Sequence, residues 1–274
     1  MHDLTSPPRA AAGVIAFILV CEFALTILFV SPWFPMQALG ALQQATGGWI
    51  AITLLASATF GGIGVWIALR HGGQDFASLG WRVRDLAPAL VVLVGAWLLL
   101  QIIAISAHGG PPVPTTAVAD GRWGRVFGPV LAQLGGTALM EETLYRAFLW
   151  PQLRLRFAAV MPPRRATILA LFASQAIFAL MHIPIRVYQG AVFADLGGML
   201  LMLFASGIVL ALVYAATRNL LIAVAIHALS NAPTLVVEPA GPSPGTLMLG
   251  VCVFVCVAWP LARLRGSRGW LASR

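Results

Sequence analysis

The spacing of charged residues constrains this chain most, because it leaves long apolar runs between them. Only 9% of the 274 residues are charged and 59% are hydrophobic, whereas an ordinary soluble domain carries about 25% charge. A helix needs about 20 mostly apolar residues to cross the hydrocarbon layer of a membrane, where no water can satisfy the backbone. Several runs reach that length, so the sequence excludes a soluble enzyme and predicts an integral membrane protein.

The predicted fold is all-α and polytopic, with about eight transmembrane helices in one bundle that forms a single domain over residues 1–274. No soluble domain and no repeat of fixed period is visible. The expected spans are residues 11–30, 48–69, 86–107, 126–150, 166–185, 196–216, 220–237 and 246–262.

All 17 basic residues are arginine, and the absence of lysine excludes a Ser/Lys dyad, a Schiff-base lysine and a P-loop lysine. Thirteen arginines fall in the segments that the predicted spans place on one side of the membrane. Arg122, Arg125 and Arg186 fall on the opposite side, and Arg146 falls within a span. Because short cytoplasmic loops retain arginine, we expect both termini in the cytoplasm, with the protein in a cell inner membrane. The arginines form no single patch, so we expect the lipid bilayer as a partner and no nucleic acid.

Few ionisable side chains fall inside the expected spans, and each is a candidate functional group because charge at that depth is costly. Glu142 and Arg146 are four residues apart, the spacing of a charge-neutralising pair on one helix face. Glu141 points about 100° away from Glu142 and has no basic residue three or four positions later. Unless another helix supplies a partner, Glu141 is suited to proton transfer.

His182 and His227 are the only histidines inside the expected spans. An interhelical hydrogen bond is the alternative role for either one. Asn231 follows His227 by four residues and shares its helix face, so the two side chains could form an oxyanion hole.

Other intramembrane features indicate packing. Glu22 lies apart from the other polar groups, which favours an interhelical hydrogen bond. Gly61, Gly62 and Gly64 are typical of a close helix contact. The three cysteines fall inside apolar runs, which argues against a disulfide framework and against a zinc finger.

Three motifs with these residues resemble those of the CPBP intramembrane protease family, which includes the type II CAAX prenyl endopeptidases and bacteriocin-processing and self-immunity proteins. The resemblance covers residues 141–231. The motifs are EExxxR at Glu141, Glu142 and Arg146, FxxxH at Phe178 and His182, and HxxxN at His227 and Asn231.

The resemblance implies an eight-helix membrane fold with a polar cavity open to the cytosol, and an endopeptidase acting on a membrane-associated substrate. A prenylated CAAX tail and a bacteriocin or signal protein fit the resemblance equally well as that substrate. Glu141 and His182 would activate a water, and His227 and Asn231 would stabilise the oxyanion. Glu142 and Arg146 would give structural support or bind a substrate carboxylate. Phe178 is expected to pack rather than react.

Glu141, His182 and His227 could ligate zinc, but no HExxH motif places two ligands on one helix. We therefore expect a glutamate mechanism without metal or other cofactor. Two other functions stay open. One is a non-catalytic immunity or scaffold protein that binds a peptide partner, and the other is a small transporter, against which the chain shows no obvious paired halves.

Overall fold

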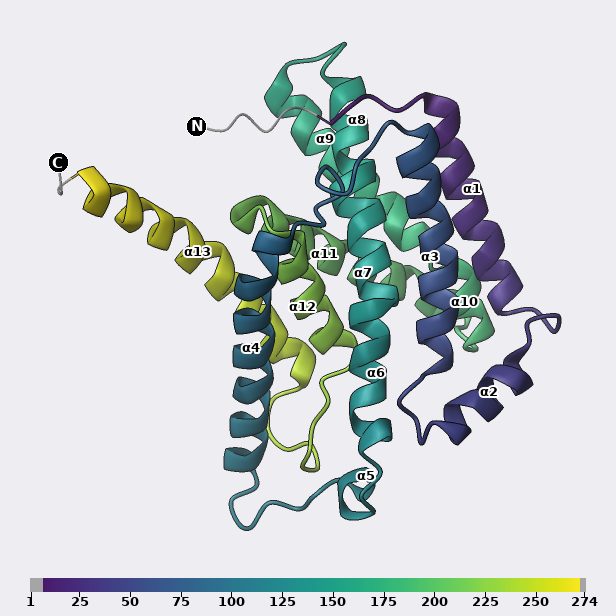
Figure 1. The fold of residues 1–274 in the computed structure, drawn as a ribbon, viewed down its shortest axis with the longest axis vertical. Helices are drawn as coiled ribbons and strands as arrows, with labels where there is room; N and C mark the ends of the chain where they lie inside the picture. The colour runs from purple at the N-terminus through teal and green to yellow at the C-terminus, as the bar shows by residue number, and fades with distance from the viewer. Residues whose placement is uncertain (1–6, 272–274) are drawn as a thin grey trace.

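The computed structural model describes residues 7–271 and folds them into helices joined by short loops (Figure 1). No strand forms within those residues, where a single isolated β-bridge joins Pro114 to Val237. The long helices are α1 (Ala12–Phe29), α3 (Ile52–His71), α4 (Leu86–Ala107), α9 (Pro163–Leu180), α11 (Phe193–Thr217) and α13 (Pro244–Leu271). The shorter ones are α2 (Met36–Ala45), η1 (Val83–Asp85), α5 (Thr116–Ala119), α6 (Trp123–Gly135), α7 (Thr137–Glu141), η2 (Glu142–Leu149), α8 (Trp150–Phe157), α10 (Ile183–Tyr188) and α12 (Leu220–Asn231).

Six helical stretches of the described chain are long and apolar enough to cross a membrane. They are α1, α3, η1 with α4, α9 with α10, α11, and the Pro244–Ala262 part of α13. At most 33% of the most apolar part of each is buried inside the protein, so most of these side chains are available to lipid. This confirms an all-α, integral, multi-pass membrane protein.

The expected span over residues 126–150 is not one α-helix. It is divided into α6, α7, the π-helix η2 and the start of α8. The Gly135-Gly136 pair causes the first division: glycine favours the helix least among residues other than proline, and Gly136 leaves helical geometry with φ −133° and ψ −104°. The second division places a rare π-helix within the EExxxR motif.

The expected span over residues 220–237 is also shorter than predicted, because α12 ends at Asn231. Pro233 explains the end: the residue before a proline avoids the α conformation, and Ala232 leaves helical geometry with φ −139° and ψ 80°. At its start, the Asn219 side chain caps the helix by accepting a hydrogen bond from the Ile222 amide. Twelve residues give about 18 Å of helix, too short to cross a bilayer alone.

Although short, α12 occupies the interior of the bundle, where it contacts α4, α6, α7, η2, α11 and α13. Nine of its twelve residues are buried, and all nine lie between Leu220 and Leu229. A helix that is apolar on every face requires such a position when it does not face lipid. The motif-bearing elements α7, η2 and α12 therefore lie together at the centre of the fold (Figure 1).

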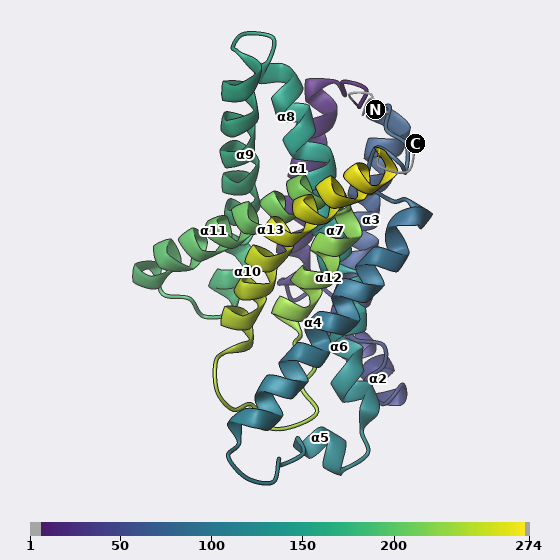
Figure 2. The ribbon, with the colours of Figure 1, turned by 90° about the vertical axis from the view of Figure 1, so that its left-hand side faces the viewer.

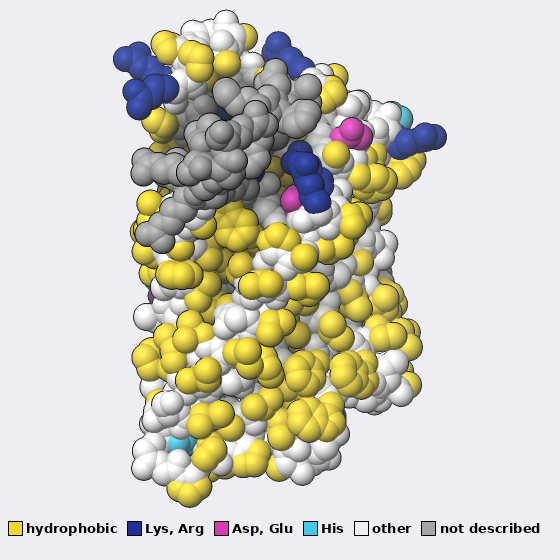
Figure 3. All heavy atoms as spheres, turned by 60° about the vertical axis from the view of Figure 1, so that its left-hand side comes forward, with side chains coloured by type: hydrophobic (Ala, Val, Ile, Leu, Met, Phe, Trp, Pro, Cys, Tyr) yellow, Lys and Arg dark blue, Asp and Glu magenta, His cyan; other side chains and the backbone are white. Residues whose placement is uncertain are grey.

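The surface agrees with membrane insertion. Figure 3 shows hydrophobic side chains over the middle of one face, with arginines gathered toward one end. The turn between α8 and α9 lies at one end of the long axis, and α5 lies at the other (Figure 2).

Two of the three glycines on α3 mediate the expected close contacts. A Cβ on Gly61 would lie 2.3 Å from Cβ of Met140 on α7. A Cβ on Gly64 would lie 2.7 Å from the Glu22 Oε1 atom of α1. Gly62 faces open space and has no such role. Gly61 thus lets α7 approach α3 directly beside Glu141.

Candidate active site

The two adjacent glutamates of the EExxxR motif lie at a junction between helix types. Glu141 is the last residue of α7, and Glu142 is the first of η2. The Glu141 side chain is 22% exposed, whereas that of Glu142 is fully buried. Only Glu141 is therefore open to a ligand.

His182 reaches Glu141 from the break between α9 and α10. Its Nδ1 atom lies 2.8 Å from the Phe178 carbonyl oxygen, a contact in which only a protonated Nδ1 can donate. In the neutral ring, the Nε2 atom then carries the lone pair. Nε2 lies 3.7 Å from Oε1 of Glu141.

His227 reaches the same carboxylate from α12. Its Nε2 atom lies 3.7 Å from Oε2 of Glu141, and its Nδ1 atom lies 2.8 Å from Oε1 of Glu142. Glu141 thus has one histidine facing each of its oxygens, supplied by separate helices. Both 3.7 Å distances are longer than a hydrogen bond, and at such separations a water molecule can bridge two polar groups.

Glu142 and Arg146 form a buried pair, with Nη1 of Arg146 3.3 Å from Oε1 of Glu142 and both side chains inaccessible to solvent. The guanidinium also lies 4.4 Å from the centroid of the Phe178 ring and 3.5 Å from the Gly207 carbonyl oxygen of α11. Since Oε1 of Glu142 contacts His227 as well, the pair fixes the orientation of that imidazole.

Phe178 packs, as expected from its apolar character. Its ring lies 5.1 Å from that of Tyr145 and 4.7 Å from that of His182, both in edge-to-face geometry, and the residue is buried. The phenyl ring therefore separates Arg146 from His182 and braces the helix break that carries His182.

Asn231 follows His227 by one turn of α12 and hydrogen-bonds to a residue outside this cluster. Its side-chain amide donates to Oε1 of Gln133 on α6 at 3.0 Å, and the residue is exposed at the end of α12. Gln133 was not singled out in the sequence, since a lone glutamine in an apolar run carries no motif.

Residues 123–233 match the protein-family model described as type II CAAX prenyl endopeptidase Rce1-like. We call residues 123–233 the Rce1-like segment, after the family model that they match. It runs from the first residue of α6 to just beyond Asn231 and contains all three motifs. The resemblance to the CPBP family is thereby confirmed for this segment. Comparisons with the curated proteins and with the solved structures find no match.

One ionisable group from outside the Rce1-like segment also approaches the site. Glu22 of α1 lies within electrostatic range of Glu141, and its Oε1 atom is buried without a hydrogen-bond partner in the described residues. The interhelical hydrogen bond expected of Glu22 is absent at that oxygen. Nothing in the sequence indicates this approach, because residue 22 is far from the motifs.

The zinc ligation considered from the sequence would use Glu141, His182 and His227. No group of three or more His, Cys, Asp or Glu side chains in the described chain has an arrangement that could hold a metal ion. The Nδ1 atom of His227 contacts Glu142 and that of His182 contacts the Phe178 carbonyl, so the Nε2 atom of each ring is left facing Glu141.

Proposed function

We propose that this protein is an intramembrane endopeptidase that hydrolyses a peptide bond of a membrane-associated substrate. The observation that carries the proposal is the Glu141 carboxylate, part-exposed among apolar helices, with an imidazole Nε2 atom 3.7 Å from each of its oxygens. A carboxylate in this setting can exchange a proton with a water held between it and an imidazole. The match of residues 123–233 to a prenyl endopeptidase family supports the same activity.

In the proposed reaction, Glu141 acts as the general base. The Nε2 lone pair of His182 orients a water molecule, and Glu141 accepts one of its protons as the oxygen attacks the peptide carbonyl carbon. The carbonyl oxygen becomes an oxyanion. Glu141 then returns the proton to the amide nitrogen as the C–N bond breaks, which leaves a carboxylic acid and an amine.

The oxyanion would be stabilised by His227 and Asn231. Because Nδ1 of His227 faces a carboxylate, its Nε2 atom can donate to an oxyanion only when the ring is protonated on both nitrogens. Asn231 uses one amide N–H on Gln133, and its second N–H is the donor we assign to the substrate. Glu142 and Arg146 are positioning residues, since their burial prevents contact with a substrate carboxylate.

We propose that the substrate class includes prenylated CAAX-type tails, presented from the cytoplasm, where we place both termini. The support is the family match and the arginine distribution. We further propose that hydrolysis proceeds without a metal, with Glu141 rather than a Lewis acid activating the water.

Cleavage assays of the purified protein test this proposal. Peptides ending in a CAAX sequence, with and without a farnesylated cysteine, would be incubated with wild type, Glu141→Gln and His182→Ala. Glu238→Gln and His71→Ala serve as matched controls because neither residue belongs to the cluster. We expect kcat to fall by about 10² or more in both site variants, since a general base contributes that much, and to stay unchanged in the controls.

A retained kcat in Glu141→Gln would refute the assigned base. A chelator arm addresses the metal: activity that survives chelation is expected, while loss on chelation and recovery with zinc would instead support a metallopeptidase. Peptide binding without cleavage by wild type would favour the immunity or scaffold function.

A further inference from the structure

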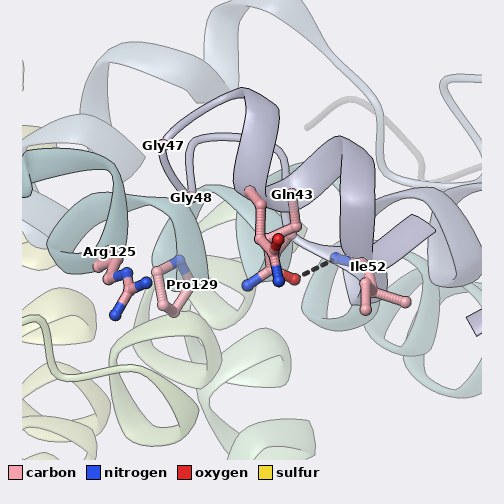
Figure 4. Close-up of a pocket in the computed structure, with 9 residues that line it drawn as sticks. Gln43, Gly47, Gly48, Ile52, Arg125 and Pro129 are labelled. Atoms are coloured by element: carbon pink, nitrogen blue, oxygen red, sulfur yellow. Dashed lines mark hydrogen bonds between the residues drawn. The ribbon is translucent and has the colours of Figure 1, made fainter. Parts of the chain in front are cut away.

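A second site lies away from Glu141, where α2 and the following loop meet the start of α6. It is a pocket of about 510 Å³ that contains no residue of the catalytic cluster. Arg125 and Pro129 of α6 form one wall and Gln43 of α2 stands on the other (Figure 4). The remaining lining residues are Gly40, Gln44, Gly47, Gly48, Ala51 and Ile52.

The pocket has a fixed backbone wall. A Cβ on Gly124 would lie 2.4 Å from the Gly47 carbonyl oxygen, and one on Gly128 would lie 2.0 Å from that of Gly48. Only glycine allows the loop to approach α6 this closely. Trp49 of the loop stacks on Phe127 of α6, with ring centroids 6.4 Å apart, and this pair stabilises the same loop–helix contact. The cavity is therefore built by the packing of α6 against the loop.

The polar groups of this pocket are donors. The guanidinium of Arg125 has no ion pair and no hydrogen bond in the described structure, whereas Arg122 pairs with Asp120 and Arg186 with Gln189. The Oε1 atom of Gln43 accepts a hydrogen bond from the Ile52 amide. The –NH2 group of Gln43 is therefore left as a donor toward a ligand. No carboxylate lines the pocket. A guanidinium on one wall and an amide N–H on the other, without a competing acid, form a donor set for phosphate oxygens.

The surrounding side chains are those found at the level of lipid headgroups. Trp49, in the loop after α2, and Trp123, at the start of α6, are exposed, and tryptophans gather at the membrane–water interface. Arg125 also lies on the side of the membrane where the predicted orientation places only three arginines. The positive-inside distribution therefore does not explain its position, and binding of an anion does.

We propose that this pocket binds the phosphate of an anionic phospholipid, with Arg125 and the Gln43 amide as its ligands, while the acyl chains stay in the bilayer. The site is independent of peptide hydrolysis. Occupancy would tie α2 to α6 at the membrane surface.

The test is lipid binding to the delipidated full-length protein in detergent, counted by native mass spectrometry. Phosphatidylglycerol, phosphatidylcholine and glycerol 1-phosphate are the probes. The variants are Arg125→Gln, Gln44→Glu, which adds a negative charge to the lining, and Arg122→Gln as the matched control from the same end of the chain. We expect phosphatidylglycerol to bind more tightly than phosphatidylcholine to wild type. Its Kd should rise about tenfold in Arg125→Gln and Gln44→Glu, the loss of one charged hydrogen bond, and stay unchanged in Arg122→Gln.

Equal weakening in Arg122→Gln would overturn the proposal, because it would indicate general surface charge. Unchanged binding in Arg125→Gln would overturn it as well. If glycerol 1-phosphate binds wild type as tightly as the lipid does, a free phosphate compound is the ligand and the lipid assignment is wrong.

Discussion

At the scale of single residues, the buried Glu142–Arg146 pair predicts a strong coupling in stability. Either substitution alone, Glu142→Leu or Arg146→Met, leaves one charge buried without its partner, which costs about 3–5 kcal/mol. The double variant removes both charges. We expect it to be less destabilised than the sum of the two single variants, as measured by thermal unfolding in detergent. Additive effects would contradict the pairing.

For Glu22, in contrast to Glu142, we expect that removing the carboxylate does not lower the stability of the protein. Its Oε1 atom has no hydrogen-bond partner in the described residues, and the Glu141 carboxylate lies in electrostatic range. The neutral amide of Glu22→Gln relieves that repulsion, so we expect an unfolding temperature at or above that of wild type. A clear fall relative to the exposed control Glu238→Gln would show that Glu22 makes a stabilising contact as an acid.

The sequence predicted the identity of most of these residues but few of their contacts. The i,i+4 spacing predicted the Glu142–Arg146 pair, because that interaction is local to one turn. The contact of Glu142 with His227 joins residues 85 positions apart, and the Asn231–Gln133 bond joins residues 98 positions apart. Such contacts depend on how helices pack, which periodicity within one helix does not determine.

At the scale of helices, the contact between α3 and α7 predicts that activity depends on a residue outside the motifs. Gly61→Ala places a methyl group on the Met140 side chain, the neighbour of Glu141 in α7. We expect overpacking to cost about 1–3 kcal/mol and peptide cleavage to fall with the shift of Glu141. Gly62→Ala is the matched control, since its methyl group meets open space. Equal activity in the two variants would exclude this coupling.

The elements also show where patterns of apolar residues are insufficient. Six expected spans correspond to long apolar helices of the described chain. The two that differ carry the EExxxR and HxxxN motifs, and in both the cause is a backbone property: Gly136 interrupts one helix, and Pro233 ends the other. Hydropathy does not register either effect.

At the scale of the whole molecule, the arginine distribution predicts the orientation in the membrane. Val160 is exposed in the turn between α8 and α9, and Val113 is exposed in the loop before α5. The α8–α9 turn and α5 lie at opposite ends of the long axis (Figure 2). In intact cells, an impermeant maleimide should label Val113→Cys, and should label Val160→Cys only after lysis. The unsubstituted chain gives the background from its native cysteines, and the reverse labelling pattern would refute cytoplasmic termini.

The π-helix η2 restricts how many residues the chain can have between Glu142 and Leu149. A π-turn closes its hydrogen bonds one residue later than an α-turn, so a chain one residue shorter between Glu142 and Leu149 would return to the α pattern. That deletion would rotate the side chains on one side of the stretch by about 100° relative to those on the other. Either Glu141 would turn away from His182 and His227, or α8 and every helix after it would have to repack. This stretch should therefore accept exchanges of residue type far more readily than the loss of a single codon.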